Sequence, residues 1–175
     1  MAKIESGKMS IEVESIAIAP LLKQVVTEIK PLLDSKGLSI RCDIPNTLPT
    51  VESDAIKIKQ IFTNLLSNAI KFTDRGGITI EVKERPMRRG FEFAVEDTGI
   101  GVKPEALSKI FETFYQVGET GRSGGSGLGL AIVKNLTHLL QGEISVESEY
   151  GTGSTFKVFL PYRLKRVTTK GSLEQ

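Results

Sequence analysis

Hydrophobic and polar residues alternate along several short stretches of the chain, and this period of two residues predicts β-strands. The predicted strands cover residues 11–14, 39–43, 50–53, 78–84, 91–96, 143–148 and 154–160. The last two flank Tyr150-Gly151-Thr152-Gly153, a sequence typical of a hairpin turn. The polar link at residues 85–90 predicts a second hairpin between the strands on either side of it.

Other stretches place apolar residues three and four positions apart, which predicts amphipathic helices. The first predicted helix begins near Pro20, where the missing N–H of a proline costs nothing, and it stops at Gly37. Pro31 lies inside this segment and is expected to kink the helix or to end it early. The apolar residues of this helix are Leu21, Leu22, Val25, Val26, Ile29, Leu32 and Leu33.

Three further helices are predicted. The longest ends near Thr73, and Ser53 or Asp54 is expected to cap its start. Another runs from Pro104 to about residue 111, and the last covers residues 128–141. Strands, hairpins and helices in this order predict an α+β fold, a two-layer α/β sandwich. Its mixed sheet has about five strands, and about three helices cover one face.

The length of 175 residues suits one domain with a real core, which we place at residues 9–162. Residues 3–8 are interpreted as the end of a helix that stops near Gly7, so residues 1–8 are expected to lie outside the domain. Residues 163–175 carry a cluster of basic residues and are expected to form a solvated C-terminal linker or tail.

The composition excludes several classes of function. The 23 Lys and Arg residues nearly balance the 21 Asp and Glu residues, so a nucleic-acid partner is not expected. The chain has no apolar run near the roughly 20 residues of a membrane span, and its start lacks the apolar core of a signal peptide. These features favour a cytoplasmic protein with no direct membrane contact.

The single cysteine, Cys42, lies in a predicted strand and is expected to be a buried, inert thiol. One cysteine and one histidine cannot form a zinc site. That histidine, His138, lies in the middle of the last predicted helix, and we expect it to be partly exposed on the surface.

The first candidate binding residues lie on the long helix that ends near Thr73. Asn64, Asn68 and Lys71 lie within about 60° of one another on a helical wheel, at the margin of the apolar face. An amide oxygen is a hard, neutral ligand of the kind that Mg²⁺ accepts, and a lysine supplies a charge for phosphate. A solvated polar face would explain the same residues, so this stripe alone does not establish a site.

Asp97 follows a predicted strand and precedes Gly99 and Gly101. Its carboxylate could accept a hydrogen bond from the exocyclic amine of adenine, whereas it would repel the carbonyl of guanine. The glycines would let the backbone approach a ligand closely. An ordinary turn, where Asp and Gly are common, explains the segment equally well.

Two glycine-rich segments follow. Gly125, Gly127 and Gly129 open the last predicted helix, where free N–H groups and the helix dipole suit phosphate. The spacing fits neither a Walker nor a Rossmann motif, so a flexible linker remains an alternative. The segment 151–156 (Gly-Thr-Gly-Ser-Thr-Phe) is explained by a hairpin turn without any ligand.

Together these segments resemble the catalytic, ATP-binding domain of sensor histidine kinases, possibly of hybrid type. This domain belongs to the superfamily shared with gyrase-type ATPases, mismatch-repair ATPases and heat-shock chaperones. The resemblance rests on an asparagine box at 60–73, a first glycine box at 96–102, a phenylalanine box at 110–117, and glycine boxes at 125–130 and 151–156. It covers residues 3–160 and implies the ATP-binding fold of that superfamily.

The resemblance also implies roles for single residues. Asn68 would be the principal Mg²⁺ ligand, assisted by Asn64 near the phosphates, with Lys71 on phosphate and Phe72 packed against the nucleoside. Asp97 would bind the adenine amine, with Gly99, Gly101 and Thr155 around the base. Residues 118–126 would form a lid over ATP, and the backbone at Gly125, Gly127, Leu128 and Gly129 would contact phosphate. Phe111 and Phe114 would anchor the lid and face partner helices.

Departures from the family pattern refine the expected activity. Gyrase and chaperone relatives carry a glutamate that activates water where this chain has Asn64, and an amide is a poor general base. Many histidine kinases have Arg at the position of Gln116, which weakens the assignment of a phosphate-contacting cation there. The acceptor-histidine motif is absent, since His138 lacks its sequence context.

The leading hypothesis is a protein histidine kinase domain with ATP and Mg²⁺ as cofactors and with Asn64 and Lys71 as its catalytic residues. It would phosphorylate a histidine on separate dimerisation helices, with a response-regulator receiver as an indirect partner, and residues 1–8 would be a remnant of the dimerisation helix. The alternatives are a docking module that binds nucleotide without transferring phosphate and an ATPase that hydrolyses it.

Overall fold

The computed structural model describes residues 2–6, 9–115 and 127–165. Its main sheet has five strands in the order β3-β5-β6-β8-β7, namely Ser39–Asp43, Gly77–Arg85, Gly90–Asp97, Gly153–Pro161 and Glu143–Glu149. Strands β3 and β5 are parallel, and the other neighbouring pairs are antiparallel. The sheet is therefore mixed, as the two hairpins predicted.

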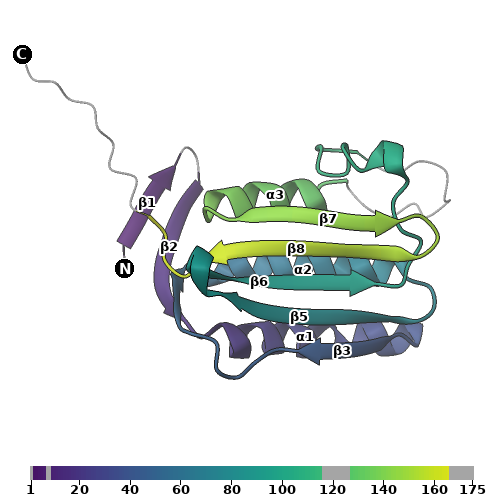
Figure 1. Ribbon diagram of the computed structural model, residues 1–175, viewed down its shortest axis with the longest axis horizontal. Helices are drawn as coiled ribbons and strands as arrows, with labels where there is room; N and C mark the ends of the chain where they lie inside the picture. The colour runs from purple at the N-terminus through teal and green to yellow at the C-terminus, as the bar shows by residue number, and fades with distance from the viewer. Residues whose placement is uncertain (1, 7–8, 116–126, 166–175) are drawn as a thin grey trace, which may run out of the picture.

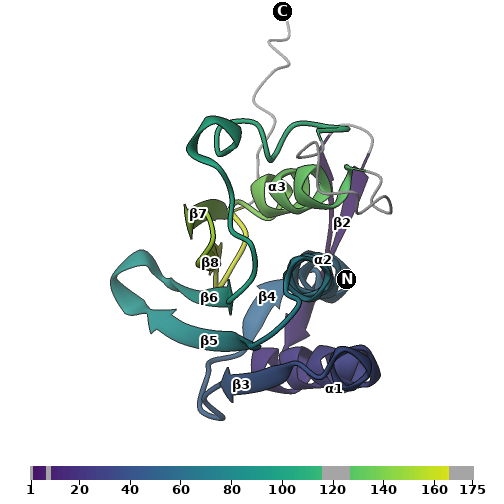
Figure 2. The same cartoon turned by 90° about the vertical axis from the view of Figure 1, so that its right-hand side faces the viewer.

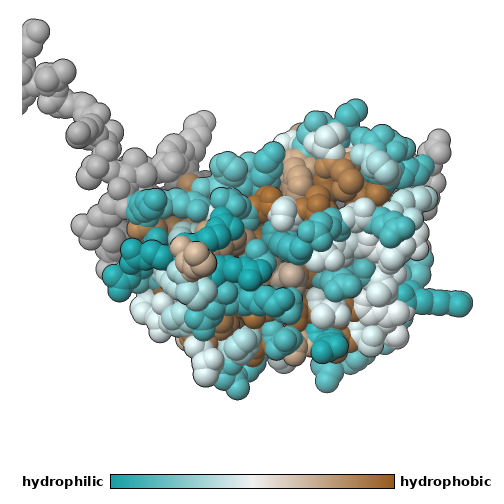
Figure 3. All heavy atoms as spheres, in the orientation of Figure 1, coloured by the Kyte–Doolittle hydropathy of each residue, from teal (hydrophilic) through white to brown (hydrophobic). Residues whose placement is uncertain are grey.

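Three helices cover one face of this sheet: α1 (Ile18–Lys36), α2 (Ala55–Phe72) and α3 (Gly129–Leu139). Figure 2 shows the sheet and the helices as two layers, with α2 beside α1. The predicted α/β sandwich of about five strands and three helices is confirmed. On the other face, hydrophilic side chains predominate over the strands (Figure 3).

The core lies between α2 and the central strands. Phe62 of α2 meets the edge of Phe93 of β6, with ring centroids 5.4 Å apart, and both side chains are fully buried. The inward residues of β5, β6 and β8 alternate with half-buried or exposed ones, so one apolar face of the sheet is sealed by the helices. This packing fixes α2 relative to the end of β6, where the candidate site lies.

A smaller sheet pairs β1 (Ala2–Ser6), β2 (Met9–Ile16) and β4 (Val51–Ser53) in antiparallel fashion at one end of the molecule. The helix end expected at residues 3–8 is therefore wrong for residues 3–6, which belong to strand β1. Residues 7–8 lie outside the described residues. Because β2 already pairs with β4, its other edge offers free backbone groups, and pairing with that edge overrides the local helical pattern.

Two expectations concern prolines. Pro31 does not end α1, which continues to Lys36, because Ile29 and Leu33 on either side of the proline are buried and hold the turn. The helix expected from Pro104 is only a short 3₁₀ turn, Pro104–Ala106, followed by further turns. In this segment Ala106 and Ile110 are the buried residues, and two anchors one turn apart do not sustain a regular helix.

The structure also shows the exposure of Cys42 and His138 and the contacts of residues 163–165. Cys42 is exposed, so the expected burial is wrong: among the described strands, β3 lies at the edge of the main sheet and pairs only with β5. His138 is exposed, as predicted. Residues 163–165 contact the rest of the domain: Arg163 forms a β-bridge with Glu52, and the side chain of Gln141 bonds both the backbone N–H and the C=O of Lys165. Residues 166–175 lie outside the described residues.

Candidate functional site

Helix α2 carries the first group of candidate residues. Its N-cap is Asp54, whose carboxylate accepts hydrogen bonds from the backbone N–H of Lys57 at 3.0 Å and of Glu12 at 2.9 Å. This cap ties the start of α2 to β2 and thereby fixes the rotation of the helix. The buried stripe of α2 runs through Ile58, Ile61, Phe62, Leu65, Leu66, Ala69 and Ile70.

Asn64 and Asn68 are half-buried and lie beside the start of α3. The position of a β-carbon on Gly129 would be 3.6 Å from the Oδ1 atom of Asn64 and 3.9 Å from that of Asn68. The Nδ2 group of Asn64 donates to the carbonyl of Gln60 at 2.9 Å, which leaves its oxygen free to face α3. The structure therefore brings both amides beside the glycine that opens α3.

The N-terminus of α3 adds backbone donors to this place. Its N-cap, Leu128, has no side chain that could accept a hydrogen bond from the first N–H groups of the helix. Gly127 has a positive φ of 68°, and its carbonyl accepts from the N–H of Phe114 at 3.0 Å. Gly125 and the expected lid at 118–126 lie outside the described residues, as does Gln116.

Lys71 and Phe72 end the same helix. The Nζ atom of Lys71 lies 5.1 Å from the centroid of the Phe72 ring, and both side chains are half-buried. The carbonyl of Phe72 accepts a hydrogen bond from the N–H of Ile100 at 3.2 Å. The C-terminus of α2 is therefore bonded directly to the loop that follows Asp97.

Asp97 is the last residue of β6, and its side chain is buried, with 7% of its surface exposed. Its Oδ1 atom accepts from the N–H of Gly99 at 2.9 Å. Burial raises the pKa of this carboxyl above its ordinary value, and the nearby charge of Glu96 raises it further. Hydrogen bonds from the backbone of Gly99 and Ser154 oppose the rise in pKa.

The glycines after Asp97 are required by close backbone contacts. A β-carbon on Gly99 would lie 2.3 Å from the Phe72 carbonyl oxygen and 2.8 Å from Oδ1 of Asp97. Gly101 has a φ of 68°, and a β-carbon there would lie 2.1 Å from the carbonyl of Glu149. The loop therefore fits between α2 and the β7–β8 hairpin only because these positions lack side chains.

Thr155, which was expected near the base with Asp97, lies on the opposite face of the sheet. Asp97 is paired with Ser154, and Glu96 with Thr155, and directly paired residues share a face. The residue on the helix side is therefore Ser154, which is buried. The alternation of the strand contained this signal, because Phe156 points inward and Thr155 must then point outward.

Ser148 is a second residue that the sequence analysis missed. Its hydroxyl lies 2.9 Å from that of Ser154, donates to the carbonyl of Gly153 and accepts from the N–H of Val102 at 2.8 Å. It therefore links the hairpin to the end of the Asp97 loop. Nothing in the local sequence distinguishes it from other serines in strands.

The two aromatic residues of the expected phenylalanine box lie differently. Phe111 is half-buried and meets the edge of Phe156, with ring centroids 6.3 Å apart. Phe114 is 73% exposed and has a positive φ of 63°. Of the two, only Phe114 offers a large apolar surface to a partner.

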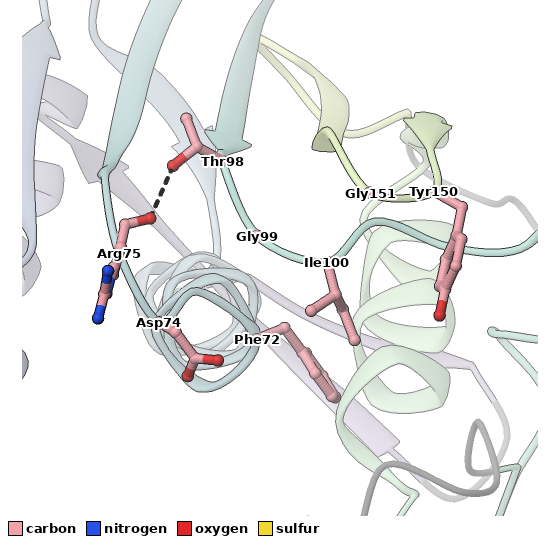
Figure 4. A pocket seen from close by; sticks show the side chains of 8 residues that line it. All are labelled: Phe72, Asp74, Arg75, Thr98, Gly99, Ile100, Tyr150 and Gly151. Atoms are coloured by element: carbon pink, nitrogen blue, oxygen red, sulfur yellow. Dashed lines mark hydrogen bonds between the residues drawn. The ribbon is translucent and has the colours of Figure 1, made fainter.

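A cavity of about 320 Å³ opens beside the Asp97 loop. In Figure 4 the side chains of Phe72 and Ile100 point to the same side, beneath the loop, and Tyr150 stands across from them. Thr98 Oγ1 donates to the carbonyl of Arg75 at 3.3 Å on the rim. The lining residues are Phe72, Asp74, Arg75, Thr98, Gly99, Ile100, Tyr150 and Gly151.

The described residues hold no group of three or more His, Cys, Asp or Glu side chains that could bind a metal ion. The amide oxygens of Asn64 and Asn68 are of the kind that magnesium accepts. Among the described residues, no helix is long and apolar enough to span a membrane.

A model of the histidine kinase-, DNA gyrase B- and HSP90-like ATPase family matches residues 53–164. The chain is 42% identical over 170 residues to hybrid signal transduction histidine kinase L of Dictyostelium discoideum, a match that covers 93% of this chain and 10% of that protein. It is 40% identical to the autoinducer 2 sensor kinase/phosphatase LuxQ of Vibrio vulnificus, over 91% of this chain and 20% of LuxQ. The chain thus spans a tenth to a fifth of the length of these relatives.

Solved structures show the same fold. Full-length ShkA in complex with AMPPNP superposes with a TM-score of 0.79 at 34% identity, over 89% of this chain and 32% of that one. The catalytic domain of histidine kinase ThkA superposes with a TM-score of 0.75 at 24% identity, over 87% of this chain and 97% of that one. The second likeness concerns the fold alone.

Proposed function

Because this chain belongs to the histidine kinase-, DNA gyrase B- and HSP90-like ATPase family, we propose that it binds magnesium-ATP and donates the γ-phosphoryl group to a histidine on separate dimerisation helices. A receiver domain would accept the phosphoryl group afterwards, in two-component signalling. The relatives whose names include a histidine or sensor kinase support this choice within the family.

One observation carries the proposal: a single helix, α2, joins the two ends of the site. Asn64 and Asn68 face the start of α3, and eight residues after Asn64 the carbonyl of Phe72 is bonded to the loop of Asp97. Eight residues of helix rise by about 12 Å, the scale of an extended nucleoside polyphosphate. A purine at Asp97 and phosphates at Gly129 would thus lie along one helix.

At the base, Asp97 accepts the hydrogen bond of the adenine amine. Gly99, Gly101 and Ser154 surround the ring, and Phe72 packs against the nucleoside. The buried carboxylate excludes guanine, because the carbonyl of guanine would face a second acceptor with no donor between them. Selectivity for adenine follows from this mismatch.

At the phosphates, the amide oxygens of Asn68 and Asn64 fit a magnesium ion that arrives with ATP. These oxygens are hard, neutral ligands, and they lie beside the start of α3, which has no side-chain cap. The remaining coordination positions of the ion would be filled by phosphate and water. When bound, the ion would offset charge on the transferring phosphoryl group. Lys71 and the backbone of Gly127, Leu128 and Gly129, with Gly125 beyond the described residues, would bind phosphate oxygens.

Phosphoryl transfer then depends on position. The imidazole of the partner histidine attacks the γ-phosphorus in line, the bond to the bridging oxygen breaks, and ADP leaves with that electron pair. Asn64 cannot take a proton from water, so bound ATP would persist until the imidazole arrives. His138 of this chain is exposed on α3 and is not the expected acceptor.

The experiment is to incubate the chain with γ-labelled ATP, magnesium and a dimerisation-helix pair taken from one of the hybrid kinase relatives. Acid-labile, base-stable label on the helices supports transfer. ATP binding without phosphohistidine would instead favour the docking module, and steady release of phosphate by the chain alone would favour the ATPase.

A further inference from the structure

The end of α2 is stabilised from outside the helix. Its C-cap, Thr73, has extended backbone angles (φ −108°, ψ 119°), not the left-handed conformation that often closes a helix. The last carbonyls of such a helix have no partner within it, so each needs a donor from elsewhere. These carbonyls belong to the turn that carries Lys71 and Phe72.

Lys36 supplies most of these donors. Its ammonium group donates to the carbonyls of Ile70 at 2.6 Å and Thr73 at 2.8 Å, and lies 3.5 Å from that of Lys71. The carbonyl of Phe72 is bonded instead to the N–H of Ile100. A positive charge at this end of a helix is also favoured by the helix dipole.

The backbone of Lys36 is itself fixed. It is the last residue of α1, and Gly37 follows in the left-handed conformation, with φ 65°. The N–H of Gly37 donates to Asp34 at 3.1 Å, and that of Leu38 to Leu33 at 3.0 Å. Leu33 and Leu38 are both buried, so this capping motif anchors the residue from which the ammonium group reaches α2.

We propose that Lys36 is a positioning residue of the nucleotide site, an inference that rests on the proposed nucleotide binding. It acts through the last turn of α2. The Phe72 carbonyl in that turn holds Ile100 and contacts Gly99 so closely that no β-carbon would fit between them. A shift of this turn therefore moves both the Phe72 ring and the loop that orients Asp97.

The test compares Lys36→Met with Lys30→Met. Lys30 is an exposed residue of the same helix, so its variant loses the same charge away from α2. Calorimetry with ADP, well below the unfolding temperature, should show binding about tenfold weaker for K36M, equivalent to about 1.4 kcal/mol. K30M should bind like the wild type, and Lys36→Arg, which keeps charge and donors, should recover most of the affinity.

Amide hydrogen exchange measures the coupling directly and needs no ligand. Exchange at Ile100 should accelerate in K36M, while exchange at Val95, in the centre of the sheet, should not change. If K36M does not fold, Lys36→Gln, whose side chain is shorter and carries no charge, replaces it with the same expected results.

The outcomes separate this inference from the proposed function. A wild-type chain that binds no ADP refutes the proposed function. The rate of amide exchange at Ile100 in K36M then still shows whether Lys36 holds the Asp97 loop in place. A wild-type chain that binds ADP, with a K36M variant that binds equally well and shows unchanged exchange at Ile100, overturns the role of Lys36. A lower unfolding temperature alone would then mark it as merely stabilising.

Discussion

The backbone N–H of Ile100 lies 3.2 Å from the carbonyl oxygen of Phe72, and this hydrogen bond joins the loop after β6 to the end of α2. The residues proposed to bind purine and those proposed to bind phosphate meet through it. Because Gly99 packs against the same carbonyl, the loop has little freedom to move alone. The expected effects of substitutions follow from this linkage.

Replacing Asp97 with Asn should weaken ADP binding by at least about tenfold. The amide places a donor where adenine also offers a donor, and losing a hydrogen bond to a charged group costs about 1.5–3 kcal/mol. Calorimetry with ADP measures the change. Asp43→Asn, at an exposed residue of β3, is the matched control and should bind normally. Unchanged affinity in D97N would remove Asp97 from the base.

The same substitution should behave differently when stability is measured without nucleotide. The pKa of Asp97 is raised in the folded state, so its ionisation opposes folding above its unfolded pKa of about 3.9. At neutral pH, D97N should therefore unfold at a temperature no lower than that of the wild type. The difference between the two unfolding temperatures should vanish as the pH falls below about 3.9. A wild type that is clearly more stable at neutral pH would contradict the raised pKa.

Asn68→Ala should weaken magnesium-ATP binding more than the binding of ATP in the presence of a chelator, because the lost amide oxygen is proposed to contact the cation. We expect a loss of about tenfold with magnesium, the cost of about one hydrogen bond or ligand contact. Asn135→Ala, at an exposed position on α3, controls for the loss of a surface amide. Equal losses with and without magnesium would take Asn68 away from the metal.

Ser154 and Thr155 offer a direct test of strand register. Ser154→Val removes the hydroxyl that lies beside Ser148 and adds bulk on the face of Asp97, so nucleotide binding should weaken. Thr155→Val preserves shape on the opposite face and should leave affinity unchanged. The reverse result would restore the assignment of Thr155 to the base.

Asn64→Glu places a general base on α2, beside the start of α3. It should raise the rate of steady ATP hydrolysis, since a positioned base contributes about 10²–10⁴-fold to such rates. Release of inorganic phosphate by the chain alone measures it. Ser67→Glu adds the same charge on the exposed face of α2 and should leave the rate unchanged. If both variants hydrolyse ATP at the wild-type rate, the identity of residue 64 does not explain slow hydrolysis.

Much of this site could be predicted because its signals are local. Each of these signals depends on neighbours within a few residues: the alternation in β5 and β6, the Asp54 cap, and the stripe of Asn64 and Asn68. Glycines at 99 and 101 likewise indicated close backbone approach before any partner was known. These features follow from the period of a strand or a helix and from backbone sterics, which the sequence alone determines.

The tertiary structure decided which distant groups meet. Lys36 reaches the end of α2, residues 2–6 form a strand, and Cys42 lies exposed on an edge. In each case the outcome depends on hydrogen bonds and buried surface shared between segments far apart in the chain. The free energy of these contacts exceeds local preference, so no pattern within one segment could reveal them.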